Sequence, residues 1–354
     1  MAAVSMKPVD RLPFWPKIFD IYVKSQSAPF CDMSLNDVHN YIGSDKHAKV
    51  GACYKIVRKN VSVEVIKDNN TNTTVYKTPV GSTTAIDKYT ASSDSWHPVK
   101  HPIETLEDLK IMTVFFTNSK TEIDYDKLEL ARQRYKEIGD DAITSTNIGT
   151  SALMEFVERL AGVENANYLL ADYPDEVSEL FEEIHKDILR RAEISAENSP
   201  ADIINIMENT STTLISPTQY RTYCFDHINQ YGSIVKQAGK PFMIHMCGHL
   251  KDLLPDLSKL NASAFEAFTS PTLGNTTLLD GRTGCPDKCL IGGTNAILWT
   301  QDSDTIIKKI EENLDALPHH RGIVVTSAGV MPPFAKPETI KTVCDWVKSY
   351  KIRM

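Results

Sequence analysis

A histidine and a cysteine lie two residues apart at the end of a short apolar run. In the stretch Pro241–Gly248, the residues from Phe242 to Ile244 are typical of a buried strand, and His245 and Cys247 follow them. Side chains at positions i and i+2 of a strand point to the same side. Because an imidazole and a thiolate are good zinc ligands, the pair predicts half of a catalytic zinc site. The alternative is a buried histidine beside an unreactive core cysteine, and this spacing alone does not decide between them.

Other apolar runs are also followed by polar residues. Glu208 and Glu266 each follow directly on strand-like residues, where a carboxylate needs a cation, a metal ion or hydrogen bonds. Glu266 belongs to the predicted strand after the one that carries His245. Adjacent strands lie about 4.8 Å apart, so Glu266 is predicted to reach a metal ion held by His245 and Cys247. The alternative for both glutamates is an exposed loop carboxylate. Further polar strand ends are Thr146-Asn147, Asn209 and Thr294-Asn295.

Size and composition restrict the class of protein. The 354 residues are 42% hydrophobic and 24% charged, as in ordinary globular proteins, and the net charge of -8 argues against nucleic acid as a partner. No apolar run is long enough to span a bilayer, and the first residues do not resemble a signal peptide. Seven irregularly spaced cysteines suggest free thiols in a reducing compartment, so we expect a cytoplasmic protein that does not contact membranes.

The elements that would position these residues form a regular pattern over residues 141–354. Six strand-like runs alternate there with amphipathic helical runs, which indicates a parallel sheet covered by helices. Residues 1–140 are irregular and include a predicted β-hairpin made of Val50–Ile66 and Thr74–Val80, while Ser93–Pro102 is predicted as a loop. With two more strands in the irregular part, the pattern predicts a single α/β domain over residues 1–354, an eight-stranded (β/α)8 TIM barrel with N-terminal helical and hairpin additions.

An open doubly wound sheet is the alternative fold. No Gly-x-Gly-x-x-Gly follows a strand, which disfavours it. In a barrel, active sites lie at the carboxyl ends of the strands. Cys285 and Cys289 precede a strand and are therefore assigned to the opposite end, where a second metal site is not expected.

With these residues in place, the sequence resembles the uroporphyrinogen decarboxylase superfamily, and more closely its zinc- and corrinoid-dependent methyltransferase branch. The family fold is the eight-stranded barrel. The segments that carry the resemblance are Glu208–Pro217, Ala238–Gly248, Phe265–Pro271, Leu290–Asn295, Val330–Pro333, Lys336–Ile340 and the early Thr78–Gly81.

Two departures from the family pattern matter. Decarboxylases of this family carry an arginine-rich motif near the N-terminus, where this chain has only Arg11, so porphyrin decarboxylation is not expected. The thiol-methylating branch binds zinc with His-x-Cys and a distant cysteine after the last strand, where this chain has Thr326-Ser-Ala-Gly-Val. Glu266 matches the position of a zinc-binding glutamate in the similar site of cobalamin-independent methionine synthase.

The resemblance implies transfer of a methyl group from a small methoxylated compound, for which we expect an aromatic ring, to the cob(I)alamin of a corrinoid protein. A zinc site with fewer thiolates withdraws more electron density from an ether oxygen, which favours this direction. His245 and Cys247 would hold Zn2+, with Glu266 completing or tuning the site. The expected substrate contacts are Glu208, Asn209, Asn147 and Asn295. The alternatives are transfer from a methylated corrinoid to a thiol or folate, and a binding barrel without catalysis.

Overall fold

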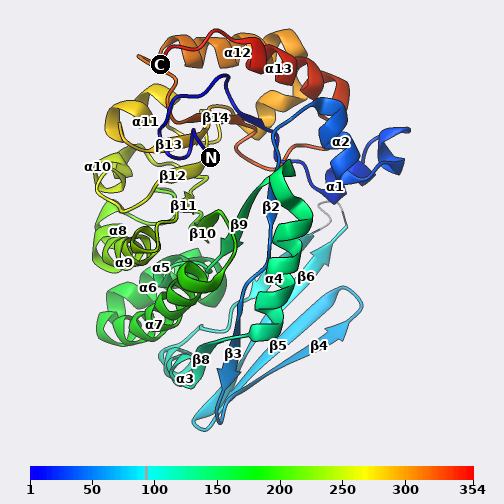
Figure 1. The fold of residues 1–354 in the computed structure, drawn as a ribbon. Helices are drawn as coiled ribbons and strands as arrows, with labels where there is room; N and C mark the ends of the chain where they lie inside the picture. The colour runs from blue at the N-terminus through cyan, green and yellow to red at the C-terminus, as the bar shows by residue number, and fades with distance from the viewer. Residues whose placement is uncertain (92–94) are drawn as a thin grey trace.

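Parallel strands that curve into a nearly closed barrel form the centre of the protein (Figure 1). The computed structural model describes residues 1–91 and 95–354. Within these residues eight parallel strands pair in the order β1-β14-β13-β12-β11-β10-β9-β2, and β1 and β2 form the two edges where the barrel stays open. This arrangement confirms the predicted α/β TIM barrel. The strands are β1 (Phe14–Trp15), β2 (His47–Lys49), β9 (Ile143–Asn147), β10 (Ile203–Met207), β11 (Phe242–His245), β12 (Ala264–Phe268), β13 (Cys289–Gly292) and β14 (Ile323–Thr326).

Helices cover the outside of the barrel. They are α1 (Asp20–Lys24), α2 (Leu35–Ile42), α3 (Leu106–Thr117), α4 (Tyr125–Ile138), α5 (Ala152–Glu155), α6 (Val163–Asp172), α7 (Pro174–Asn198), α8 (Pro217–Tyr223), α9 (Phe225–Gln237), α10 (Leu254–Leu257), α11 (Leu278–Gly284), α12 (Ser303–Asp315) and α13 (Pro337–Ser349). Short 3-10 turns are η1 (Phe30–Asp32), η2 (Gly139–Asp141), η4 (Lys251–Leu253) and η5 (Ala296–Thr300), and η3 (Phe156–Leu160) is a π-helical turn.

Local chemistry explains where several helices begin. The hydroxyl of Ser34 accepts a hydrogen bond from the backbone N–H of Asp37, which caps α2 as its sequence predicts. Proline at the first position starts α13, because a missing N–H costs nothing at a helix N-terminus. These signals hold the helices in the positions from which their apolar faces can cover the barrel.

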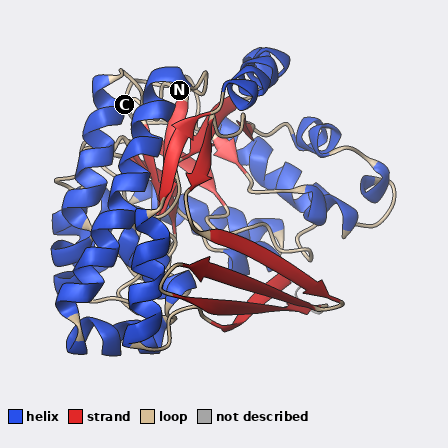
Figure 2. Cartoon of the chain, turned by 90° about the horizontal axis from the view of Figure 1, so that it is seen from below, coloured by secondary structure: helices blue, strands red, loops and turns tan. Residues whose placement is uncertain are grey.

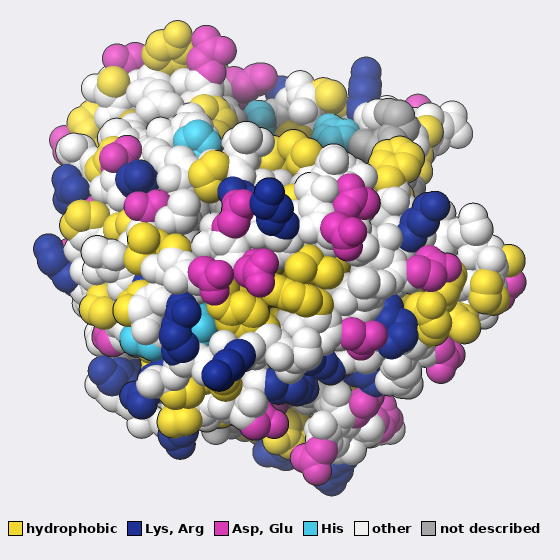
Figure 3. Space-filling view, turned by 90° about the horizontal axis from the view of Figure 1, so that it is seen from above, with side chains coloured by type: hydrophobic (Ala, Val, Ile, Leu, Met, Phe, Trp, Pro, Cys, Tyr) yellow, Lys and Arg dark blue, Asp and Glu magenta, His cyan; other side chains and the backbone are white. Residues whose placement is uncertain are grey.

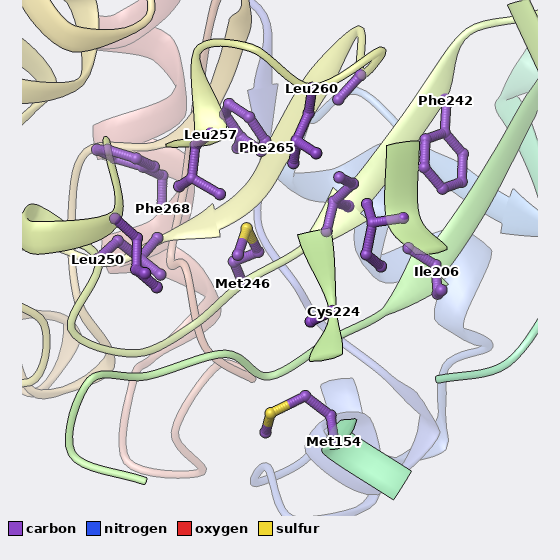
Figure 4. Close-up of a cluster of buried hydrophobic side chains, with 14 of the residues drawn as sticks. Met154, Ile206, Cys224, Phe242, Met246, Leu250, Leu257, Leu260, Phe265 and Phe268 are labelled. Atoms are coloured by element: carbon purple, nitrogen blue, oxygen red, sulfur yellow. The ribbon is translucent and has the colours of Figure 1, made fainter. Parts of the chain in front are cut away.

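The main core lies between the barrel and the helices. Alternate strand residues such as Phe242 and Phe265 point outward and belong to one buried cluster, in which Leu257 of α10 lies beside Phe265 (Figure 4). On each strand, the residues that alternate with these outward ones point into the barrel. Met243, for example, belongs to a separate cluster inside it. This alternation directs His245, two residues after Met243, into the barrel as well.

A second sheet projects from the barrel (Figure 2). It is formed by the part of the sequence between β2 and α3. Among the described residues, β4 (Ser62–Asp68), β5 (Thr71–Thr78), β6 (Gly81–Thr90) and β7 (Ser95–Lys100) form a four-stranded antiparallel sheet. Beside it, β3 (Tyr54–Arg58) pairs with β8 (Ser119–Ile123). The predicted hairpin is confirmed in that β4 and β5 pair antiparallel, but it belongs to a larger sheet. The predicted loop Ser93–Pro102 is wrong over Ser95–Lys100, where β7 forms, and its residues 93 and 94 lie outside the described part.

The surface carries charges of both signs. On the face seen in Figure 3, acidic, basic and hydrophobic side chains are interspersed. In the part of the chain that the structure describes, no helix has both the length and the apolar character needed to cross a bilayer. All seven cysteines are free thiols, as the sequence predicts.

Candidate functional site

His245 and Glu266 meet at the carboxyl ends of two neighbouring strands. In the register of β11 and β12 these two residues are direct partners. Nδ1 of His245 donates a hydrogen bond to Oε2 of Glu266, and both side chains are buried. Cys247 lies two residues beyond His245, just after the end of β11, and is exposed. The structure thus brings His245 and Glu266 into contact and places Cys247 nearby along the chain.

A buried lysine, which the sequence analysis missed, completes this group. Nζ of Lys17, two residues after β1, lies 2.7 Å from Oε1 of Glu266 and donates to the carbonyl oxygen of Ala328 at 3.3 Å. Trp15 lies beside the ammonium, with its ring centroid 5.8 Å away. The sequence contained a signal for this position of Lys17. Trp15 and Lys17 are two residues apart at the first strand, so their side chains are expected on the same, inner side.

The Glu266 carboxylate is stabilised as a charge by both neighbours, Lys17 and His245, whereas the charge of Lys17 disfavours the imidazolium of His245. Burial disfavours the Glu266 carboxylate, but the charge of Lys17 and the hydrogen bond from His245 outweigh it and lower the pKa of Glu266. Burial likewise disfavours the imidazolium, while hydrogen bonds to Cys247 and Glu266 raise the pKa of His245. In the metal-free protein the site therefore holds a carboxylate between two cations.

Asn209 connects the thiol to a second missed residue, Glu158. The thiol of Cys247 donates to Oδ1 of Asn209 at 3.6 Å, and Nδ2 of Asn209 donates to Oε2 of Glu158 at 3.2 Å. Glu158 comes from the π-helical turn η3, and π turns are frequent at functional sites. Burial raises the pKa of Glu158. Asn209, a predicted substrate contact, thus belongs to the same group as Cys247.

Backbone strain is concentrated around this group. Asn209, Ala267 and Ala328 have φ values of 46°, 61° and 61°, although none of them is glycine. Each lies next to a residue of the site or contacts one, since Ala267 follows Glu266 and Ala328 accepts from Lys17. Left-handed backbone at non-glycine residues persists where the surrounding structure enforces it, which happens often at functional sites.

Glu208 points away from the other predicted site residues. Its side chain is fully buried, Oε1 accepts from the backbone N–H of Ser151 at 2.6 Å, and the thiol of Cys224 donates to Oε2 at 3.4 Å. Burial raises the pKa of Glu208 to about 7 despite these hydrogen bonds. In this structure Glu208 holds the start of α5 against β10.

Replacing Glu208 by glutamine is expected to change how stability depends on pH. A carboxyl with a pKa of about 7 when folded and 4.5 when unfolded stabilises the fold below pH 4.5 and loses this contribution as pH rises through 7. The free energy of unfolding of Glu208→Gln should therefore gain about 3 kcal/mol relative to wild type between pH 4.5 and 8. Urea unfolding across this range measures it, with Glu107→Gln at an exposed carboxylate as control. Parallel curves for Glu208→Gln and wild type would contradict the prediction.

The remaining predicted residues lie apart from the cysteine. Oδ1 of Asn147 accepts from the backbone N–H of Gly149, and Asn295 caps η5 and donates to the carbonyl oxygen of Pro271 at 2.7 Å. Cys285 and Cys289 are buried, and burial raises the pKa of both thiols to about 12. The predicted contacts of the two asparagines with substrate stay predictions. So does the prediction that the two cysteines hold no metal ion.

Two cavities flank the barrel. The larger, about 710 Å³, is lined by the first residues of β9 and β10, Ile143 and Ile203, and therefore lies at the amino ends of the strands. None of the predicted site residues lines it. The smaller, about 220 Å³, includes Asn147 and Met207 at the carboxyl ends. We take the carboxyl end as the candidate site because the polar group around His245 lies there.

Gly248 lets the Cys247 segment pack closely against the loop after β10. A Cβ at position 248 would lie 2.7 Å from the carbonyl oxygen of Thr210 and 2.6 Å from Oγ of Ser211. Gly248→Ala is therefore expected to lower the free energy of unfolding by about 1–3 kcal/mol and to displace Cys247. Urea unfolding and the rate of thiol modification measure the two effects. Gly329→Ala is the control, because its Cβ would meet only Ala296 at 3.4 Å, and equal effects of both substitutions would contradict the packing argument.

His245 and Cys247 are of the residue types that zinc prefers, but they do not by themselves make up a zinc site. Metal-binding histidines usually donate their other ring N–H to a carboxylate, as His245 does to Glu266, and this leaves Nε2 and the Cys247 sulfur as donors. Among the described residues, no three His, Cys, Asp or Glu side chains are grouped closely enough to hold one metal ion.

A parallel eight-stranded barrel with a buried polar group at the carboxyl ends of its strands has the plan of a TIM-barrel enzyme. The family model for uroporphyrinogen decarboxylase (URO-D) matches residues 98–350. This match covers more than half of the chain, which therefore belongs to the uroporphyrinogen decarboxylase family. No curated protein matches the sequence.

One solved structure shares the fold over nearly its whole length, and a second is a weaker match. A methyltransferase from Methanosarcina mazei is 13% identical, with a TM-score of 0.60 over 98% of this chain and 96% of that chain. A putative vitamin-B12 independent methionine synthase from Listeria monocytogenes is 16% identical, with a TM-score of 0.41 over 63% of this chain and 66% of that chain. At 13% identity the likeness to the methyltransferase concerns the fold alone.

Proposed function

We propose that this protein is a zinc-dependent methyltransferase that moves a methyl group from a methoxylated aromatic compound to the cobalt of a corrinoid protein. The observation that carries the proposal is the contact of His245 with Glu266 at the carboxyl ends of β11 and β12, with Cys247 two residues after His245. The likeness to a methyltransferase fold over nearly the whole of both chains supports the same class of reaction.

His245 and Cys247 would hold the zinc ion. When bound, zinc supplies a Lewis acid for the ether oxygen of the substrate. Glu266 orients the imidazole through Nδ1, and Asn209 holds the thiol through its Oδ1. A site with one thiolate leaves more positive charge on the metal than a site with two, which suits an ether better than a thiol.

The reaction balances without an external oxidant or reductant. The bond between the ether oxygen and the methyl carbon breaks, and a bond between this carbon and cobalt forms. The methyl group leaves without its bonding electrons, cobalt(I) supplies the electron pair and becomes cobalt(III), and the departing oxygen takes up a proton. The protein's contribution is to hold the ether oxygen and the cobalt on opposite sides of the methyl carbon.

The loops around the mouth favour a large partner. Exposed apolar side chains follow the carboxyl ends of four strands that are neighbours in the barrel, β12, β13, β14 and β1. They are Leu273, Ile297, Val330, Phe334 and Phe19, and Phe334 is 84% exposed. Exposed apolar residues grouped at one end of a soluble protein are typical of an interaction surface. We assign this rim to the corrinoid protein, which must bring its cobalt to the barrel mouth.

The position of Arg11 argues against porphyrin decarboxylation. Its guanidinium is paired with Asp45 at 2.7 Å and lines the cavity at the amino ends of the strands. A substrate at the barrel mouth therefore has no arginine from this segment to bind its carboxylates.

The deciding experiment follows the cobalt spectrum of a reduced corrinoid protein. The protein is mixed with cobalt(I) and, in turn, with 2-methoxyphenol, 4-methoxybenzoate, trimethylamine and methanol. Appearance of methyl-cobalt with the methoxyarenes alone is the expected result. Loss of methyl-cobalt on adding a thiol or folate instead would favour the reverse direction, and no change under any condition would leave a binding barrel.

A further inference from the structure

The larger cavity, about 710 Å³ in volume, lies at the seam where the barrel stays open. Among the described residues, no backbone pairing joins the two edge strands β1 and β2. Trp15 of β1 and His47 of β2 both line the cavity, and their rings meet edge to face with centroids 4.6 Å apart. A cavity of this volume is typical of sites for small ligands. It is therefore a candidate binding site at the end of the barrel opposite to His245.

The floor of the cavity is apolar and belongs to the inside of the barrel. Met243, Ile291 and Val324 line it from three different strands and are members of the inner buried cluster. Trp15 and Ile143 pack against the same cluster and also line the cavity, but they are only half-buried. Apolar surface that is left partly in water at the bottom of a cavity gains free energy when an apolar ligand covers it.

Charged side chains also line the cavity, and carboxylates are in excess. Arg11 is paired with Asp45 at 2.7 Å and Lys46 with Asp141 at 2.8 Å, so these four charges cancel in pairs. Three further carboxylates of the lining form no salt bridge with any residue that the structure describes, namely Asp10, Asp140 and Asp202. The amino group of Met1 adds one positive charge, and the described lining still keeps a negative excess.

The two histidines of the lining do not offset this excess. Nδ1 of His39 is hydrogen-bonded to Oγ of Ser44 at 2.7 Å, and Nε2 of His47 to Oγ of Ser145 at 2.8 Å. Burial lowers the pKa of both imidazoles to about 4, so both are neutral at pH 7. An apolar floor combined with surplus negative charge favours a ligand that is apolar at one end and positively charged at the other.

We propose that this cavity binds a small organic cation. The apolar or aromatic body of the ligand lies against Trp15 and Met243 inside the barrel, and its ammonium faces Asp10 and Asp140. Both aspartates are exposed, so they lie on the solvent side of the cavity, where the charged end of the ligand stays hydrated. This inference goes beyond the proposed methyl transfer and requires no metal ion at the barrel mouth.

Three probes of similar shape and different charge test the proposal: 2-phenylethylammonium, 2-phenylethanol and phenylacetate. They are titrated at pH 7 and followed by the methyl resonances of methionine, with the signal of Met243 identified by its absence from Met243→Leu. The cation is expected to shift this signal with a dissociation constant of about 1 mM or tighter, the alcohol to bind several-fold more weakly, and phenylacetate to bind least. Added salt should weaken the cation alone. Equal affinities, a preference for phenylacetate, or no shift of Met243 with any probe would overturn the inference.

Two double variants then locate the charge that matters. Asp10→Asn/Asp140→Asn should weaken binding of 2-phenylethylammonium by about 3- to 10-fold and leave 2-phenylethanol unchanged. Its matched control is Asp68→Asn/Asp172→Asn, which changes the net charge equally at two exposed aspartates outside the cavity lining.

The control should bind all three probes as wild type does. Equal losses of affinity in the two double variants, or no loss in either, would remove the cavity carboxylates from the site and overturn the inference. Both measurements use the protein without a corrinoid partner, so a failure of methyl transfer leaves their outcome unaffected. Conversely, a cavity that binds none of the probes leaves the proposed methyl transfer intact.

Discussion

Replacing Cys247 by alanine is expected to abolish zinc binding and to lower methyl transfer by about 10³-fold or more. One of the two donors at the barrel mouth is then gone, and a Lewis acid that contributes several kcal/mol to the transition state is lost with it. Metal analysis of the purified variant and the rate of methyl-cobalt formation measure the two effects. Equal zinc in Cys247→Ala and wild type would remove Cys247 from the ligand set.

The control for this substitution is Cys31→Ala. Cys31 lies in η1 and is partly exposed. Of the seven cysteines, all of them in the described part of the chain, Cys247 is the most exposed. A thiol reagent should therefore modify Cys247 first in the metal-free protein, and added zinc should slow this modification. Cys31→Ala should keep both zinc and the protected thiol. A reaction rate that zinc does not change would contradict a role of the Cys247 sulfur as a ligand.

The regular part of the barrel follows from the sequence because each strand there is a short apolar run between amphipathic helices. Two of the six strand-like runs, Ala264–Phe268 and Ile323–Thr326, coincide with β12 and β14. The strand β2 has the sequence His-Ala-Lys, which carries no apolar signal, and its place in the barrel is set by pairing with β9. Such a strand is determined by tertiary contacts that local sequence does not contain.

The added sheet was underestimated for a related reason. The β4 strand is exposed throughout, and β5 and β6 are rich in threonine and only partly buried, so these strands lack the alternation that a buried face produces. Pro98 within β7 also argued for a loop, but β7 is an edge strand that pairs only with β6, and edge strands tolerate proline. The sequence therefore predicted two strands where the structure has four.

At the site, the sequence predicted neighbours along the sheet better than directions of side chains. Glu266 meets His245 because strand order and register follow from the repeating units. Glu208 follows β10 equally directly, yet it points away to Ser151. Lys17 and Glu158 were missed because one follows a two-residue strand and the other depends on a π-helical turn, which shifts the side chains relative to a regular helix.

Replacing Lys17 by methionine is expected to lower the free energy of unfolding by about 3–5 kcal/mol, because Glu266 then keeps a buried charge without its cation. Glu266→Gln leaves the ammonium unpaired and should have a similar effect. The double variant should lose much less than the sum of the two, since neither charge remains. Urea unfolding of the four proteins measures this coupling.

Lys46→Met serves as control. It should change the free energy of unfolding by less than about 1 kcal/mol, because Asp141, the partner of Lys46, is 58% exposed and the pair is screened by solvent. Additive effects of the Lys17 and Glu266 substitutions would show that the two charges do not depend on each other. A further outcome would say more: Lys17→Met/Glu266→Gln could be as stable as wild type and yet no longer bind zinc through His245. The fold would then not need this ion pair, and the reason for two buried charges inside the barrel would be the chemistry at Cys247.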